Sequence, residues 1–193
     1  MNMTRRTFCA SCLASTISAN SVAQVFENNV ADFGAKICAY GGTVPSNSHT
    51  SNFGEAAPEA KKIVELMQEL VGIYPRIEVF AADFDPEYRF SAFATVRNKQ
   101  RYIVYNRAQL KWGNEDIEWG PVVVMGHEVG HHVASHVFAD EVTQHKQELE
   151  ADRFSGFVLG KLGATLSQAQ TWDRGNQAAT ETHPSSADSR QVI

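Results

Sequence analysis

The sequence contains two histidines and a glutamate in the run His127-Glu128-Val129-Gly130-His131. Residues four apart lie on the same face of a helix, so the imidazoles of His127 and His131 can both reach one zinc ion. Glu128 would then lie beside the metal rather than on it. There its carboxylate can take a proton from a zinc-bound water and later give it to a leaving amine. The spacing therefore predicts a zinc site with a general base.

A zinc site of this kind needs a third protein ligand and keeps one coordination position for water. In the longer metzincin motif, a glycine and a third histidine continue the helix, but those two positions here hold Ala134 and Val137. His136 is one residue short of the third-histidine position. The metzincin pattern is therefore excluded, and we interpret His132 and His136 as surface residues or as groups that support a ligand.

A pair of acidic residues, Glu148 and Asp152, is a better source for the third ligand. On one helical face, Glu148 can ligate zinc while Asp152 accepts a hydrogen bond from a ligand histidine. Glu150 lies about 200 degrees around the helix from Glu148, so both cannot point inward. Geometry alone does not choose between them, but the partnership with Asp152 favours Glu148. His145 is a weaker candidate, and a solvated acidic helix face is the alternative interpretation of the pair.

Two helices are needed to position these groups. Residues 120–137 are apolar on most faces, which predicts a buried helix with Pro121 in its first turn. A further helix is expected over about residues 141–162 and should end near Gly163. The acidic pair lies on this second helix. From residue 171 onward the chain is polar, and we expect a tail there.

An earlier amphipathic helix should begin at Pro58 and end near Gly72 and Pro75. Its expected core-facing stripe consists of Ile63, Leu66, Met67, Leu70 and Val71. Such a stripe is typical of core packing, so the helix needs no cofactor to explain its apolar side chains.

Short extended segments follow at residues 77–82, 90–97 and 101–105, and residues 98–100 are expected to form a hairpin loop between the last two. Residues 91–96 are rich in alanine and phenylalanine and are expected to form an edge strand. Such a strand can pair with an extended peptide, although an ordinary edge strand would have the same sequence.

The N-terminus has the organisation of an export signal. Arg5 and Arg6 precede about a dozen small or apolar residues, and cleavage is expected after Ala23. The paired arginines resemble a twin-arginine signal. An uncleaved signal, or a lipid on Cys12, would instead anchor the chain to a membrane. We expect three regions: a signal peptide at 1–23, an irregular lead-in at 24–54 with one short element near 35–40, and a single domain at 55–193.

The composition sets limits on function. The chain has 193 residues, 43% of them hydrophobic, which is enough for one domain with a real core. Its formal net charge of -5 argues against nucleic-acid binding, which needs a basic face. No apolar run is long enough to span a bilayer once the signal is removed. The three cysteines cannot form a disulfide framework, and Cys38 alone would remain in the mature chain.

The runs H-E-V-G-H, E-L-E-A-D-R-F and H-P-S-S together resemble the HtpX-like gluzincin metallopeptidases, a group that includes the CAAX prenyl endopeptidases and the Oma-type mitochondrial peptidases. The strands at 91–94 and 103–105 are similar to the edge strand of that family and its neighbour. The resemblance covers about residues 58–190. It implies an α+β, zincin-like minimal catalytic domain, in which a small, mostly antiparallel sheet packs on the helix with the first motif and the next helix carries the second.

By this resemblance, His127, His131 and Glu148 bind Zn²⁺, Glu128 is the general base and Asp152 orients a ligand. His183 matches the late histidine that stabilises the oxyanion in the family, although a turn residue in a polar tail is the alternative. The chain departs from familiar members because it lacks transmembrane helices, joins the ligand helices by a short loop and has Ser185 in place of a second proline.

The first hypothesis is therefore a soluble, exported zinc endopeptidase, periplasmic or secreted, that acts on a peptide or protein. The second is a non-catalytic module stabilised by zinc, or a latent enzyme whose cleft is closed by residues 24–54 or by the tail. The third is a zinc amidase that acts on a non-peptide amide such as a cell-wall link.

Overall fold

A computed structural model describes residues 38–40, 50–74, 76–86, 90–112, 118–138, 144–171, 178–179 and 183–193. The expected signal peptide lies outside the described residues. The elements in chain order are β1 (Cys38–Tyr40), β2 (Thr50–Glu55), α2 (Pro58–Val71), β3 (Ile77–Phe84), β4 (Ala92–Arg97), β5 (Gln100–Asn106), α3 (Trp119–Val133), the 3-10 helix η2 (His136–Phe138), α4 (Gln144–Lys161), α5 (Leu166–Ala169) and α6 (Ser186–Val192). The fold is α+β, as the sequence predicts.

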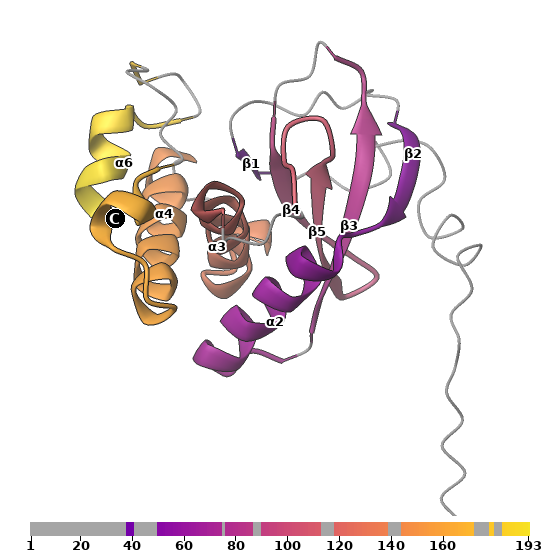
Figure 1. The fold of residues 1–193 in the computed structure, drawn as a ribbon, viewed down its shortest axis with the longest axis horizontal. Helices are drawn as coiled ribbons and strands as arrows, with labels where there is room; N and C mark the ends of the chain where they lie inside the picture. Colours follow the sequence, from indigo (N-terminus) through magenta and orange to yellow (C-terminus); the bar gives the residue numbers. More distant parts are fainter. Residues whose placement is uncertain are drawn as a thin grey trace, which may run out of the picture.

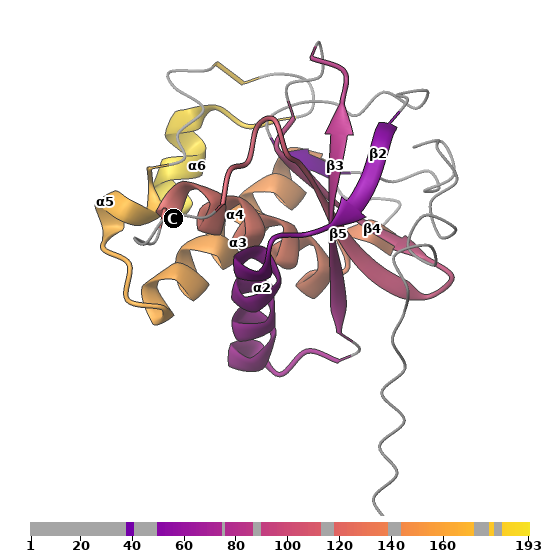
Figure 2. The same cartoon turned by 45° about the vertical axis from the view of Figure 1, so that its right-hand side comes forward.

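The strands form one mixed sheet in the order β1-β4-β5-β3-β2. β3 and β5 are parallel, while the other three neighbouring pairs are antiparallel. The helices α2, α3 and α4 lie on one side of this sheet (Figures 1 and 2). α2 and α3 pack on the strands and on each other, and α4 packs on α3. The motif helix α3 is therefore held between the sheet and α4.

The hairpin between β4 and β5 is tighter than expected. Arg97 pairs with Gln100, so the connection has two residues and Gln100 belongs to β5 rather than to the loop. Asn98 and Lys99 adopt positive φ angles of 50° and 66°. Two successive left-handed residues match the right-handed twist of the flanking strands, which is why such short hairpin turns are favoured.

Two expectations about the N-terminal region and the sheet edge are wrong. The strand β2 pairs with β3 at residues 50–55, where an irregular lead-in was expected. The expected short element near residues 35–40 is confirmed as β1. β1 pairs antiparallel with β4, with Cys38 opposite Ala94 and Tyr40 opposite Ala92. Because β1 covers this side of β4, β4 is an interior strand of the described sheet and not its edge.

The apolar stripe of α2 is also partly wrong. The buried residues of this helix are Ala60, Val64, Met67 and Gln68. Leu66 and Leu70 are instead 38% and 47% exposed. The face that packs on the core is therefore rotated from the predicted stripe. The predicted end of the helix is confirmed, because Gly72 forms the left-handed C-cap with a φ of 68°.

The motif helix α3 is buried along residues 121–132, as expected. It ends at Val133, however, and Val137 lies in η2 rather than in the same helix. Ser135 has a φ of 60°, which is outside the helical region and ends the helix there. The chain then turns back so that η2 contacts both α3 and β4.

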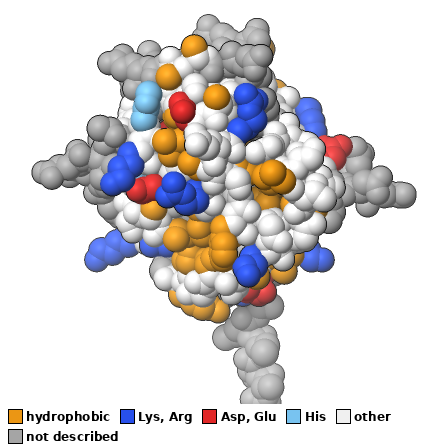
Figure 3. Space-filling view, turned by 90° about the vertical axis from the view of Figure 1, so that its left-hand side faces the viewer, with side chains coloured by type: hydrophobic (Ala, Val, Ile, Leu, Met, Phe, Trp, Pro, Cys, Tyr) orange, Lys and Arg blue, Asp and Glu red, His pale blue; other side chains and the backbone are white. Residues whose placement is uncertain are grey.

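The outer layer consists of α4, α5 and α6. Its solvent face carries basic side chains among separate groups of hydrophobic ones (Figure 3). The exposed hydrophobic residues of this layer include Phe157 in α4 and Leu166 in α5. Within the described part of the chain, we find no helix with the length and apolar character needed to cross a membrane.

Two glycines allow α3 and α4 to pack closely. A Cβ atom added at Gly126 would lie 2.7 Å from the hydroxyl oxygen of Ser155. A Cβ atom added at Gly130 would lie 2.9 Å from the Cα atom of Ala151 and 3.0 Å from its carbonyl oxygen. The second contact is with backbone, which cannot move aside as a side chain can. Glycine at these two positions is thus what allows α3 to lie so close to α4. The motif residues His127, Glu128 and His131 lie beside these contacts.

We therefore predict that Gly130→Ala destabilises the protein. Alanine in a helix is normally favoured over glycine by about 1 kcal/mol, but overpacking here should cost about 1–3 kcal/mol. Gly160 in α4 is the control, because an added Cβ meets no atom within 4 Å there. Gly160→Ala should be neutral or stabilising. Urea denaturation of both variants tests this, and equal stabilisation by the two substitutions would contradict the close-packing argument.

Candidate metal centre

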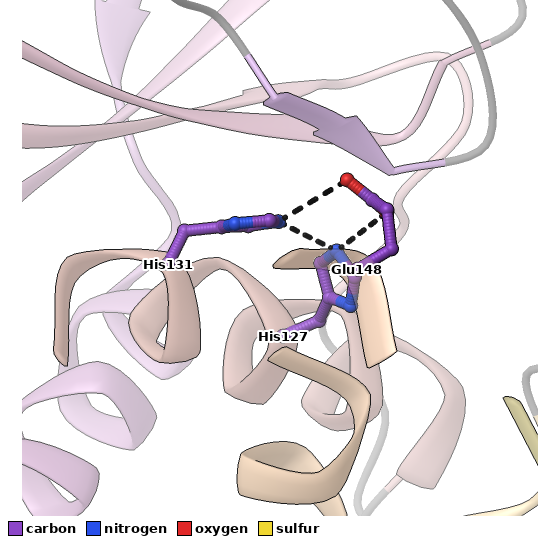
Figure 4. Close-up of side chains that lie close together, drawn as sticks. All are labelled: His127, His131 and Glu148. Carbon is purple, nitrogen blue, oxygen red and sulfur yellow. Dashed lines mark hydrogen bonds and ion pairs between the residues drawn. The ribbon is translucent and has the colours of Figure 1, made fainter. Parts of the chain in front are cut away.

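Three side chains from two helices converge at one point. His127 and His131 extend from α3, and Glu148 extends from α4 (Figure 4). The two Nε2 atoms are 2.9 Å apart. Glu148 Oε2 is 3.3 Å from His127 Nε2, and its Oε1 is 3.6 Å from His131 Nε2. One ligand atom from each residue lies within 4.8 Å of the others, and all three residues are buried. This group can hold a metal ion.

Asp152 is one turn beyond Glu148 on α4, and its Oδ1 atom is 2.7 Å from Nδ1 of His127. A carboxylate can only accept a hydrogen bond, so Nδ1 carries the hydrogen and donates it. The lone pair of neutral His127 is then on Nε2, the atom in the metal group. Asp152 therefore has the contact that was expected of it, and it fixes the ring in the form that binds a metal.

Glu150 is not part of the metal group. Its Oε2 atom is 3.0 Å from Nε2 of His136, and its Oε1 atom is 3.8 Å from Nζ of Lys146. The other candidate ligand, His145, is not in the group either. Glu148 therefore provides the third ligand atom, and its partnership with Asp152 on the same helical face had favoured this choice.

His132 and His136 are both buried, so the interpretation of either as a surface residue is wrong. The Nε2–H group of His132 donates to the carbonyl oxygen of Tyr102 at 2.9 Å, which ties α3 to β5. Burial lowers the pKa of His132 to about 4, so the ring is neutral at pH 7. His136 supports a ligand, because its Nδ1 atom is 3.0 Å from Nδ1 of His131.

The charges of the group favour a cation at its centre. Burial lowers the pKa of His127, but Asp152 and Glu148 together raise it more, to about 10. Burial alone would raise the pKa of Glu148, yet the neighbouring histidines hold it below its ordinary value. Burial and the adjacent positive His127 lower the pKa of His131. These shifts place one proton's positive charge among a carboxylate and two imidazoles, and a metal ion held by the same three ligand atoms would take the place of that proton.

Glu128 and His183 were the expected catalytic side chains. Glu128 is fully buried in α3, next in sequence to His127. His183 lies just before α6, and its Nε2 atom is 3.6 Å from Oε2 of Glu148. Its side chain is 15% exposed, so it lies at the metal group and also reaches the surface.

A short C-terminal helix, found where a polar tail was expected, brings His183 to the group. Ser185 caps the start of α6 by accepting a hydrogen bond from the backbone N–H of Asp188. α6 then packs on α4, where the backbone of Ile193 lies close to Gly156. Ser185 is the sequence signal for this helix, because serine is a preferred N-cap.

No protein-family model, curated protein or solved structure matches the chain.

Proposed function

We propose that the chain is a zinc-dependent metalloendopeptidase of the gluzincin type. The observation that carries this proposal is the convergence of His127, His131 and Glu148 on one point, with Glu128 next along the same helix. Two imidazoles and one carboxylate are a typical ligand set for catalytic zinc, because they leave a coordination position for water. The resemblance of the two helix motifs to HtpX-like peptidases supports the same activity.

Each side chain near the group has a distinct task in this proposal. His127, His131 and Glu148 would hold the zinc ion, which would supply Lewis acidity toward a peptide carbonyl and toward water. Glu128 accepts a proton from the attacking water and returns it to the leaving amine. His183 donates a hydrogen bond to the carbonyl oxygen as negative charge develops on it. Asp152 holds His127 through the 2.7 Å contact with Nδ1.

We propose that the substrate is an extended peptide that pairs with β4. The described structure already has an antiparallel strand at this position, since β1 pairs with Ala92, Phe93 and Ala94. β1 also lies against α3, the helix that carries the histidines. A peptide that adds to β4 from the same side would form the same backbone hydrogen bonds. It would have to replace β1 to do so.

A latent form of the enzyme is the second candidate, and the pairing of β1 with β4 is the observation that favours it. The residues of β1 are part of the same chain, so they compete with a free peptide at a high effective concentration. In this form, residues 38–40 block the substrate path until they are displaced or removed. The lead-in then has a regulatory function.

We therefore predict that cutting the chain just after β1 raises peptidase activity. A recognition sequence for a specific protease is inserted between residues 45 and 46, and the purified protein is assayed before and after cleavage. Release of the N-terminal fragment should raise activity by at least about tenfold, because the tethered competitor is lost. The control carries the same insertion between residues 23 and 24, where cleavage leaves β1 attached. Unchanged activity after the fragment has dissociated would show that β1 is not inhibitory.

The activity itself is tested by the zinc content of the chain that begins at residue 24 and by its hydrolysis of peptides with and without zinc. Bound zinc and metal-dependent cleavage of internal peptide bonds are expected. If the protein binds zinc but hydrolyses no peptide, before or after the release of β1, it is not a peptidase. Zinc would then only stabilise the fold.

A further inference from the structure

The candidate ligand His131 has another histidine as its outer partner. Its Nδ1 atom is 3.0 Å from Nδ1 of His136. The opposite ring nitrogen of His136, Nε2, is 3.0 Å from Oε2 of Glu150. The side chain of His136 is only 3% exposed, while that of Glu150 is 38% exposed. These three residues form a continuous polar chain from near the surface to the metal group.

We propose that His136 and Glu150 are positioning residues that place the hydrogen of His131 on Nδ1 and thereby direct its Nε2 lone pair at the metal. The inference rests on the metal group of the proposed function, but it does not depend on peptidase activity.

The carboxylate of Glu150, at the outer end of this polar chain, determines the direction of both hydrogen bonds that link the three residues. The Glu150 carboxylate can only accept, so Nε2 of His136 must carry a hydrogen and donate it. Neutral His136 then has its lone pair on Nδ1, where it accepts from the Nδ1–H group of His131. The remaining lone pair of His131 is on Nε2. If His136 Nδ1 donated to His131 Nδ1 instead, Nε2 of neutral His136 would be an acceptor facing the carboxylate, which is also an acceptor. In addition, Nε2 of His131 would carry the hydrogen and could not bind a metal.

This polar chain also gives a function to Glu150, the third acidic residue on α4. Glu148 enters the metal group directly, and Asp152 contacts His127 directly. Glu150 lies on a different face of the helix, because two residues correspond to about 200 degrees of rotation. It reaches the group only through His136. Each ligand histidine thus has its outer nitrogen tied to a carboxylate of α4, one directly and the other through an intervening imidazole.

The local backbone supports a positioning function for His136. The helix α3 ends at Val133, and the chain reverses at Ser135, whose φ of 60° is uncommon for a residue other than glycine. This reversal returns His136 to the side of His131. The conformation has a steric cost, so surrounding contacts must hold it in place. The two hydrogen bonds of His136 are such contacts.

The first test measures zinc affinity by competition with a chromophoric chelator. His136→Leu removes the acceptor of His131 and should weaken zinc binding about 10- to 100-fold. His136→Gln retains an oxygen that accepts and an N–H that donates, so it should restore most of the affinity. Glu150→Ala should weaken binding less than His136→Leu does. His132→Leu is the matched control, because it removes a buried histidine on α3 that contacts Tyr102 rather than the metal group.

A general loss of stability would lower zinc affinity equally in His136→Leu and His132→Leu, and this result would overturn the proposal. Wild-type affinity in the His136 and Glu150 variants would also overturn it. If His136→Leu does not fold, the proposal is still tested by Glu150→Ala, because that position is partly exposed. The spectroscopic test below needs no variant.

The second test locates the hydrogen by long-range ¹H–¹⁵N NMR of the zinc-loaded protein. The expected spectrum shows His131 with its hydrogen on Nδ1 and His136 with its hydrogen on Nε2. A hydrogen on Nε2 of His131 would overturn the proposal. An unaltered protein that binds no zinc would contradict both the metal centre and this inference, whereas zinc binding without hydrolysis would contradict the peptidase activity alone.

Discussion

The substitution Glu128→Gln is expected to leave the metal centre intact and to remove peptide hydrolysis. Glu128 is adjacent to His127 on α3 but is not one of the three residues in the metal group. Glutamine has almost the same size and fits the same buried position, but it cannot accept a proton from water. Because a well-placed general base contributes about 10²- to 10⁴-fold to a rate, activity should fall by that factor.

This prediction requires zinc content and activity to be measured on the same preparations. The control is Glu78→Gln, the same substitution at an exposed position on β3, and it should have wild-type activity. Zinc content should be equal in all three proteins. If Glu128→Gln retains its zinc and hydrolyses peptides as fast as the unaltered protein, Glu128 is not the base.

Removal of the metal is expected to destabilise the whole domain. The three ligands join α3 to α4, so an ion that binds only the folded state stabilises it by mass action. At a free zinc concentration about 1,000 times the Kd, this stabilisation is about 4 kcal/mol. For a domain of this size, it corresponds to a fall in Tm of about 8–16 °C when a chelator removes the zinc.

The variant Glu148→Ala tests whether this stabilisation comes from zinc bound at the metal group. It removes one of the three ligands, so addition of zinc should no longer raise its Tm by the same amount. His132→Gln is the control, because a glutamine N–H can still donate to the carbonyl of Tyr102 and the metal group is unchanged. That variant should retain the full response to zinc. Equal Tm values for the unaltered protein in zinc and in chelator would show that no metal is held there.

The metal group could be predicted from the sequence because its spacing is local. His127 and His131, and likewise Glu148 and Asp152, are each four residues apart on a helix. Helical geometry alone brings such pairs to one face. The choice of Glu148 over Glu150 needed a partner argument, and the 2.7 Å contact between Asp152 and His127 agrees with it.

The contacts that were missed depend on residues distant in sequence or on a turn without a clear signal. β1 pairs with β4 across more than fifty residues, and nothing in either strand indicates this partner. The contact of His136 with His131 depends on the left-handed backbone at Ser135, which sequence patterns rarely reveal. By contrast, the close packing of α3 and α4 had a visible signal, since Gly126 and Gly130 are four residues apart and share one face.

Peptide hydrolysis by the chain that begins at residue 24 is the most direct test of the central claim. The protein is stripped of metal, loaded with one equivalent of zinc and incubated with a mixture of peptides, and the products are identified by mass spectrometry. We expect internal peptide bonds to be cleaved with zinc, to remain intact after chelation and to be cleaved again when zinc is restored. One equivalent of zinc bound by His127, His131 and Glu148, with no peptide cleaved even after release of β1, would contradict the claim.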